Sequence, residues 1–294
     1  MPFDGYGHPD RADRTQTASA HTGPGFAGAR VSKRQPPGGQ APVVQRIRIR
    51  YAKRGPLRFT SHRDFARAIE RAIHRANVPI AFSQGFSPHP KLSFASAAPT
   101  GVASEAEYLE IGLRERVSPD ELRIALDAAL SPGLDLMEAV EARSTDSLAD
   151  RITASRWQVE LPGVTSDSLE QAIKLFLARE EVLVERLTKQ GRRTFDARGA
   201  VHSMRQVPAP EVGPNGSMRV PCAILDLVVR QVTPSVRPDD VLSGLRVVAD
   251  LEPAAPARVT RLVQGTLTAH GEIVDPLLPD RALHPHEPAI IGER

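Results

Sequence analysis

The feature that most constrains the fold is a switch of hydrophobic period, which recurs along the chain. Residues 45–51 alternate between arginine and apolar side chains. This period of two is typical of a half-buried strand, with Ile and Tyr facing inward and Arg outward. Residues 62–77 then change to a helical period, which places Phe65, Ile69, Ala72, Ile73 and Ala76 on one face. Such a chain is expected to build a mixed α and β structure.

The same succession of strand and helix patterns fills two consecutive segments. The first continues with predicted strands at 92–95, 108–113 and 134–142, and with a helix that begins at Ser118-Pro119. In the second, strands are predicted at 157–161, 182–187, 222–231 and 258–263, with helices at 167–181 and from Pro238. Both segments have the order βαββαβ, so the sequence predicts an α+β protein of two tandem ferredoxin-like units.

The predicted units cover residues 43–143 and 156–265, with residues 144–155 as their linker. Residues 1–42 and 266–294 are rich in Pro, Gly and polar residues and lack an apolar period, so both tails are expected to be disordered. Residues 208–217, with several Pro and Gly, are expected to form a surface loop.

Composition excludes several classes of protein. The single cysteine, Cys222, rules out an intrachain disulfide, a cysteine-built zinc site or an iron–sulfur cluster held by this chain alone. No stretch approaches the length of an apolar membrane span, and the first residues do not resemble a secretory signal. We therefore expect a cytoplasmic protein with no membrane partner and no metal site.

The charge is distributed unevenly. The whole chain carries 38 basic and 35 acidic residues, hence +3, whereas residues 43–91 carry eleven basic and two acidic residues, hence +9. Within this segment Arg63, Arg67, Arg71 and Arg75 stand four apart, so they form a stripe on one side of the predicted helix. The stripe is either a solvated face with acidic partners elsewhere or a surface that binds a polyanion such as RNA.

A loop rich in Gly, Pro and polar residues follows the basic helix. Two prolines flank His89 and stiffen its backbone, and Gly85 permits a left-handed turn. We expect the loop, and the region that follows it, to contact a substrate, an anion or a partner; the candidate residues are Ser83, Gln84, Gly85, Phe86, Ser87, His89, Lys91, Ser104, Glu105 and Glu107. The alternatives are a turn that satisfies its own backbone and, for the acidic residues, pairing with a neighbouring Arg.

A second basic feature lies in the second segment. The run Gly191-Arg192-Arg193-Thr194-Phe195-Asp196 predicts a hairpin with a basic tip, which either extends the anion-binding surface or is an ordinary exposed hairpin. If the protein acts on RNA as an enzyme, the candidate acid–base groups are His62, His89 and Asp196.

Several motifs, taken in order, resemble a known family. They are Thr60-Ser61-His62-Arg63-Asp64-Phe65, Arg67-Ala68-Ile69-Glu70-Arg71-Ala72, Ser83-Gln84-Gly85-Phe86-Ser87-Pro88-His89-Pro90-Lys91 and Gly101-Val102-Ala103-Ser104-Glu105-Ala106-Glu107-Tyr108. Over roughly residues 43–235 the chain resembles the radical-SAM-linked protein family, a domain of unknown function. The resemblance implies an accessory protein of a radical SAM enzyme encoded nearby, with RNA modification as a setting.

The cysteine count limits what this resemblance can mean. A radical SAM enzyme holds its [4Fe–4S] cluster with three cysteines, and this chain has one. The cluster and S-adenosylmethionine are therefore expected only in the partner, and no cofactor is expected on this chain. Three hypotheses remain: an accessory protein that binds or presents RNA or another anionic substrate, an RNA-acting enzyme such as an endoribonuclease or base-modifying enzyme, and a protein–protein adaptor.

Overall fold

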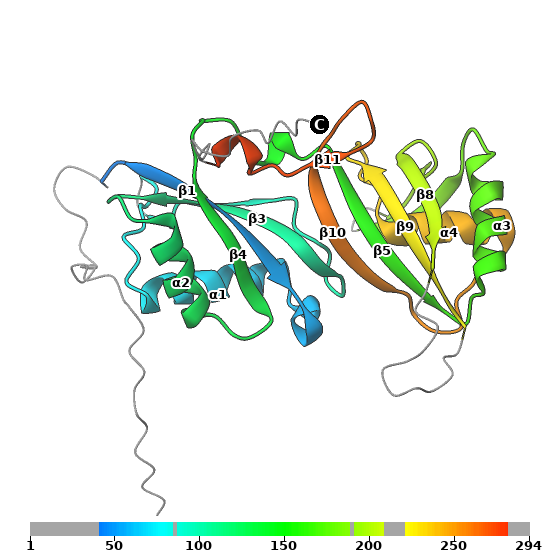
Figure 1. Cartoon of the computed structure of the whole chain (residues 1–294), viewed down its shortest axis with the longest axis horizontal. Coiled ribbons are helices and arrows are strands. Elements are labelled where there is room, and N and C mark those ends of the chain that lie inside the picture. The colour runs from blue at the N-terminus through cyan, green and yellow to red at the C-terminus, as the bar shows by residue number, and fades with distance from the viewer. Residues whose placement is uncertain (1–40, 85–86, 189–190, 209–220, 282–294) are drawn as a thin grey trace, which may run out of the picture.

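The chain forms an α+β structure around one large, mostly antiparallel sheet (Figure 1). The computed structural model describes residues 41–84, 87–188, 191–208 and 221–281. The predicted N-terminal tail up to residue 40, the end of the chain after residue 281 and most of the predicted surface loop 208–217 lie outside the described residues.

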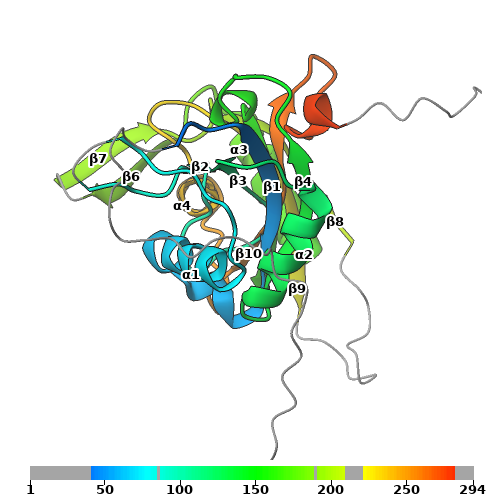
Figure 2. The same cartoon turned by 90° about the vertical axis from the view of Figure 1, so that its left-hand side faces the viewer.

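The first half of the chain folds as its periodicity predicts. Its elements are β1 (Gln45–Lys53), η1 (Gly55–Phe59), α1 (His62–Arg75), β2 (Leu92–Ala95), β3 (Ala103–Leu113), α2 (Pro119–Ala129) and β4 (Leu134–Glu141). The hydroxyl of Ser61 caps α1 by accepting a hydrogen bond from Asp64 N at 3.2 Å, and Ser118 caps α2 in the same way. Figure 2 shows α1 and α2 side by side, where they pack on one face of the sheet.

The second half contains more strands than the predicted βαββαβ order. Its elements are η2 (Ala149–Arg151), β5 (Ala154–Pro162), α3 (Ser166–Leu177), β6 (Leu183–Thr188), β7 (Gly191–Asp196), β8 (Val201–Val207), β9 (Cys222–Arg230), α4 (Pro238–Ala249), β10 (Arg258–Leu267), β11 (Ile273–Val274) and η3 (Leu278–Asp280). Strand β6 pairs with β7 in a separate hairpin, and β8, which the sequence pattern does not predict, occupies the edge of the main sheet.

One sheet of nine strands joins the two halves. Its order is β4-β1-β3-β10-β5-β9-β8, with β2 paired to β3 and β11 paired to β10. The halves meet where β3 and β10 run parallel, with Ala103 opposite Thr260 and Ser104 opposite Arg261. Figure 1 shows this junction at the centre, with the first half on the left and the second half on the right.

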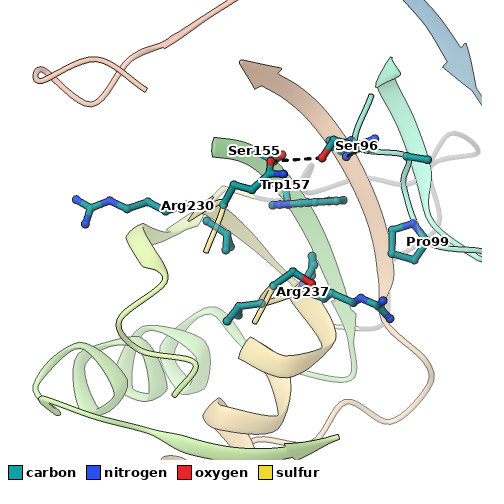
Figure 3. A pocket seen from close by; sticks show the side chains of 13 residues that line it. Ser96, Pro99, Ser155, Trp157, Arg230 and Arg237 are labelled. Carbon is teal, nitrogen blue, oxygen red and sulfur yellow. Dashed lines mark hydrogen bonds between the residues drawn. The ribbon is translucent and has the colours of Figure 1, made fainter. Parts of the chain in front are cut away.

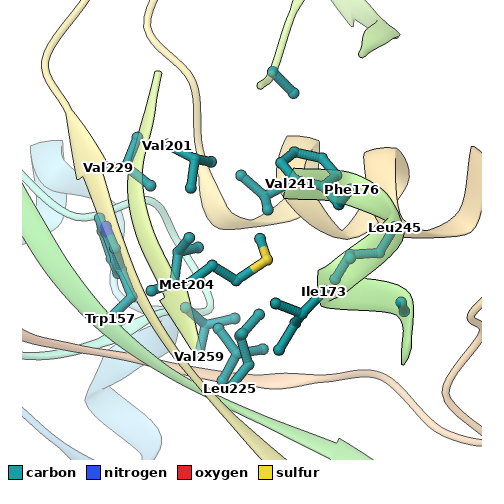
Figure 4. Packing of buried hydrophobic residues seen from close by; sticks show 14 of the residues in the cluster. Trp157, Ile173, Phe176, Val201, Met204, Leu225, Val229, Val241, Leu245 and Val259 are labelled. Atoms are coloured by element: carbon teal, nitrogen blue, oxygen red, sulfur yellow. The ribbon is translucent and has the colours of Figure 1, made fainter. Parts of the chain in front are cut away.

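Two separate cores lie under the helices. In the first, Tyr51 stacks on Phe65 with ring centroids 4.3 Å apart, and Ile47, Ile49 and Leu109 are fully buried. In the second, the side chains of α3 and α4 close over β5, β8 and β9 (Figure 4); Phe176 is fully buried there and Trp157 is almost so. No helix in the described ranges has the length and apolar character needed to cross a membrane.

The predicted C-terminal tail is partly folded, which corrects the expectation of disorder from residue 266. Strand β10 extends to Leu267, and the segment 273–281 adds β11 and η3. Leu277 is fully buried and packs with Leu148 and Ile152 of the predicted linker. These residues cover the first half of the sheet on the face that α1 and α2 leave open. The tail was missed because it has no apolar run; charged pairs hold much of it in place.

The linker and the C-terminal segment also correct the expectation that Arg48 of β1 faces solvent, whereas Arg46 is exposed as expected. Arg48 is completely buried, because residues 144–151 and 275–281 cover that face. Its guanidinium contacts Glu110 Oε2 at 2.9 Å and Asp280 Oδ2 at 2.7 Å. A period of two places residues on opposite faces of a strand, but it does not show whether another segment covers the polar face.

Candidate nucleic-acid interface

Helix α1 presents a continuous row of arginine side chains to solvent. Its buried face consists of Phe65, Ile69, Ala72 and Ile73, which are three and four positions apart, so the residues two positions from them lie on the opposite side and point outward. Arg63, Arg67, Arg71 and Arg75 are all exposed, as their spacing predicts.

Three of these four arginines have no partner in the described part of the chain. Arg75 donates a hydrogen bond to the carbonyl of Ala129 at the end of α2. The side chains of Arg63, Arg67 and Arg71 make no hydrogen bond or ion pair with any described residue. Acidic partners in the described part of the chain therefore do not neutralise these three arginines.

The arginines of β1 and of the residue that follows it behave differently. Arg54 bridges Glu105 Oε1 at 2.8 Å and Asp135 Oδ2 at 2.7 Å, and these carboxylates raise its pKa. Arg50 lies 3.9 Å from Glu138. The +9 segment therefore divides into strand arginines that are neutralised within the fold and helix arginines that are not.

Aromatic side chains lie at the N-terminal end of α1. The His62 ring meets the Phe94 ring edge-on with centroids 5.0 Å apart, and Phe94 contacts Phe65 in the same manner. Phe59 is 60% exposed, and the Arg58 guanidinium lies 4.6 Å from its ring centroid. Exposed rings beside a basic helix offer surfaces on which nucleobases stack.

The polar loop after α1 is closed by its own backbone. Ser83 N donates to the His89 carbonyl at 2.8 Å, and His89 N donates to Ser83 Oγ at 2.9 Å. The side chains of Gln84, Ser87, His89 and Lys91 are exposed, whereas Gly85 and Phe86 lie outside the described residues. Ser83 and His89 thus hold the two ends of the loop together, and His89 and Lys91 are exposed to solvent.

The three candidate residues of the region 99–107 lie in strand β3 of the sheet. Ser104 is completely buried and Glu107 is 2% exposed, where it pairs with Arg261 of β10. Glu105 pairs with Arg54. The two acidic residues thus follow the alternative expectation, pairing with a neighbouring Arg. The strand begins at Ala103, earlier than the expected strand at 108–113, because its first residues are polar and resemble a loop in sequence.

The basic hairpin forms as predicted, but Asp196 has a structural role. Its carboxylate accepts hydrogen bonds from three backbone N–H groups, those of Val182, Arg198 and Gly199, at 2.7–2.9 Å. No hydrogen bond or ion pair joins Asp196 to His62 or His89 among the residues described. Arg192 and Arg193 are exposed on this hairpin, and Arg192 pairs with Glu185 at 3.3 Å.

The structure also contains a pocket that sequence reasoning missed. It has a volume of about 240 Å³ and lies between the segment after β2 and the second half, close to the β3–β10 junction (Figure 3). Ser96 and Pro99 line it from one side, and Trp157, Arg237 and Arg261 from the other. The one available signal was Trp157, the only tryptophan of the chain.

In the described ranges, no three His, Cys, Asp or Glu side chains are grouped so that they could hold a metal ion.

Comparisons with known proteins give a family. No curated protein matches the chain. A family model described as "Uncharacterized protein conserved in bacteria (DUF2344)" matches residues 46–238, about two thirds of the chain and all of the basic helix. The chain therefore belongs to this bacterial family, a domain of unknown function.

Proposed function

We propose that this protein binds RNA through the exposed face of α1. The observation that carries the proposal is the row of Arg63, Arg67 and Arg71, which lack partners in the described chain although strand arginines of the same segment are paired. Arginine binds phosphate with a planar fork and keeps its charge at any ordinary pH. Arg75 ends the same helix, and the exposed ring of Phe59 and the exposed Lys91 belong to the segments before and after it.

The proposal predicts a strong dependence of affinity on salt. If the four stripe arginines each neutralise one phosphate of single-stranded RNA, the slope of log K against log salt is about −3. Raising the salt from about 50 to about 200 mM would then weaken binding about 50-fold.

Fluorescence anisotropy with a short, labelled single-stranded RNA of mixed sequence tests this. Substitution of Arg63, Arg67, Arg71 and Arg75 by Gln should weaken binding and flatten the salt slope. The matched control replaces Arg116, Arg179, Arg246 and Arg258, all exposed and outside α1, by Gln. Both variants change the net charge from +3 to −1. Unchanged affinity in the stripe variant, or an equal loss in the control, would refute a localised interface.

We also propose that the protein is an accessory partner of a radical SAM enzyme. The support is the resemblance of its motifs to radical-SAM-linked proteins together with its single cysteine, which leaves the iron–sulfur cluster and S-adenosylmethionine to the partner. Co-purification of the tagged chain with such an enzyme, with and without nuclease treatment, separates an RNA-bridged complex from a protein–protein adaptor. The RNA-acting enzyme has weaker support, because Asp196 is used by a turn.

The arrangement of strands supports the proposal of two ferredoxin-like units. The first half has the order β4-β1-β3-β2, and the corresponding order in the second half is β10-β5-β9-β8. In this comparison β8 takes the place that the sequence pattern gave to β6, and the β6–β7 hairpin is an insertion.

A further inference from the structure

The pocket at the junction of the two halves is strongly basic. Three of the side chains that line it are arginines (Arg230, Arg237 and Arg261), and none of its described lining residues is acidic. In Figure 3, Trp157 and Arg237 face the segment that carries Ser96 and Pro99. Of these three, Arg261 pairs with Glu107 and Arg230 contacts His202 Nδ1 at 3.1 Å, whereas Arg237 has no ion pair with a described residue.

A second buried cation, Lys53, lies behind the lining of the pocket and adds positive charge near Arg261. Arg261 is 2% exposed; it pairs with Glu107 and donates to the Ser96 carbonyl at 2.7 Å. Lys53 is 5% exposed, and the same Glu107 carboxylate is the acidic group that attracts its ammonium. The ammonium also contacts the carbonyls of Ala98 and Pro99 at 3.5 and 3.4 Å. Two buried cations thus share one anion.

This imbalance is costly to the fold. Burial lowers the pKa of Lys53, and the charge of Arg261 lowers it further against the opposing effect of Glu107. Because a buried charge without a counter-ion is unfavourable, an anion bound beside Arg261 would stabilise this cluster.

The lining also supplies hydrogen-bond donors and an apolar wall. Ser96, Ser155, Ser235 and Gln231 line the pocket together with the arginines. Trp157 provides a planar surface, and the Arg261 guanidinium lies 5.3 Å from its ring centroid. The acidic residues in the first turn of α4 do not line the pocket, and one of them, Asp240, is paired with Arg186 at 2.8 Å. Hydroxyl groups combined with arginine forks are a good match for phosphate oxygens.

We propose that this pocket binds a small phosphate-bearing anion, such as a phosphate monoester with a planar group that contacts Trp157. The volume of about 240 Å³ suits a small molecule and not a polymer. The proposal does not depend on RNA binding by α1, so the stripe variant should retain the small-anion site.

The only tryptophan of the chain lines the pocket, so its fluorescence reports binding directly. The full chain is titrated with inorganic phosphate, with adenosine monophosphate and with uncharged adenosine. Both phosphate compounds should change the emission saturably, and adenosine should not. If neither phosphate compound gives a saturable change up to millimolar concentration, or if adenosine binds as well as its monophosphate, the proposal is wrong.

Variants then locate the site. Arg237→Gln should weaken binding by at least about tenfold, since a charge-assisted hydrogen bond is lost. The backbone N–H of residue 237, which donates to Asp240 at 2.7 Å, is kept, so the start of α4 is preserved. Ser235→Ala provides a second variant with a smaller expected loss, and Arg179→Gln, exposed on another surface, is the control. Wild-type affinity in Arg237→Gln and Ser235→Ala alike would overturn the proposal.

Discussion

The buried carboxylate of Asp280 should be essential for the stability of the first half of the fold. Asp280 is 3% exposed and accepts hydrogen bonds from Arg48 Nη1 at 2.7 Å, Arg151 Nη1 at 2.6 Å and Arg143 N at 2.9 Å. The substitution Asp280→Asn keeps the size of the side chain and removes its charge. It therefore tests the electrostatic role with little change in packing.

The expected magnitude follows from what remains around Arg48. Its guanidinium is fully buried and would keep Glu110 at 2.9 Å as its only charged partner. Removing one partner of a buried ion pair costs about 3–5 kcal/mol, and the remaining pair with Glu110 places this case near the lower end, about 3 kcal/mol. At about 2–4 °C per kcal/mol for a fold of this size, Tm should fall by about 6–12 °C.

Thermal unfolding followed by circular dichroism measures this effect. Asp150→Asn, an exposed carboxylate in the neighbouring η2, is the matched control and should leave Tm unchanged. If Asp280→Asn behaves like the control, the C-terminal segment does not clamp the sheet, and the burial of Arg48 must be stabilised in another way.

The same carboxylate gives a pH dependence with a defined sign. Burial alone would raise the pKa of Asp280, but the hydrogen bonds from Arg143 N, Arg48 and Arg151 outweigh it and hold the pKa below the ordinary value of 3.8. A carboxyl group whose pKa is lowered on folding contributes stability above its unfolded pKa and loses it as pH falls. The Tm difference between wild type and Asp280→Asn should therefore be constant near neutral pH and shrink below about pH 4.

Two further substitutions test the junction of the halves and the attachment of β11. Glu107→Gln should lower the free energy of unfolding by about 3–5 kcal/mol, because Lys53 and Arg261 would stay buried without their shared carboxylate; urea denaturation with an unchanged midpoint would contradict this. Gly265→Ala should cost about 1–3 kcal/mol, since its Cβ would lie 2.0 Å from the carbonyl oxygen of Val274 and displace β11; an unaltered Tm would show that β11 does not hold the C-terminal segment.

Much of the fold could be predicted because it is encoded by local spacing. The apolar face of α1 and the caps at Ser61 and Ser118 depend only on neighbours along the chain, and all are confirmed. Strand β8 was missed for an equally local reason: the register shifts between Val201 and Ser203, so its side chains do not alternate regularly. Strand β6 was found but misplaced, because periodicity identifies a strand without naming its partner.

The sequence predicts whether an arginine is exposed only where no residue far along the chain folds back to pair with it. Arg48 and Arg63 both belong to the same basic segment, and nothing in their immediate sequence separates their roles. Arg48 finds Asp280 232 positions along the chain, a pairing that no local pattern contains. The α1 arginines stand on a face that no described segment covers, so their spacing alone was enough to predict that they are exposed. For this reason the proposal of RNA binding is based on four helix arginines, and not on the whole +9 segment.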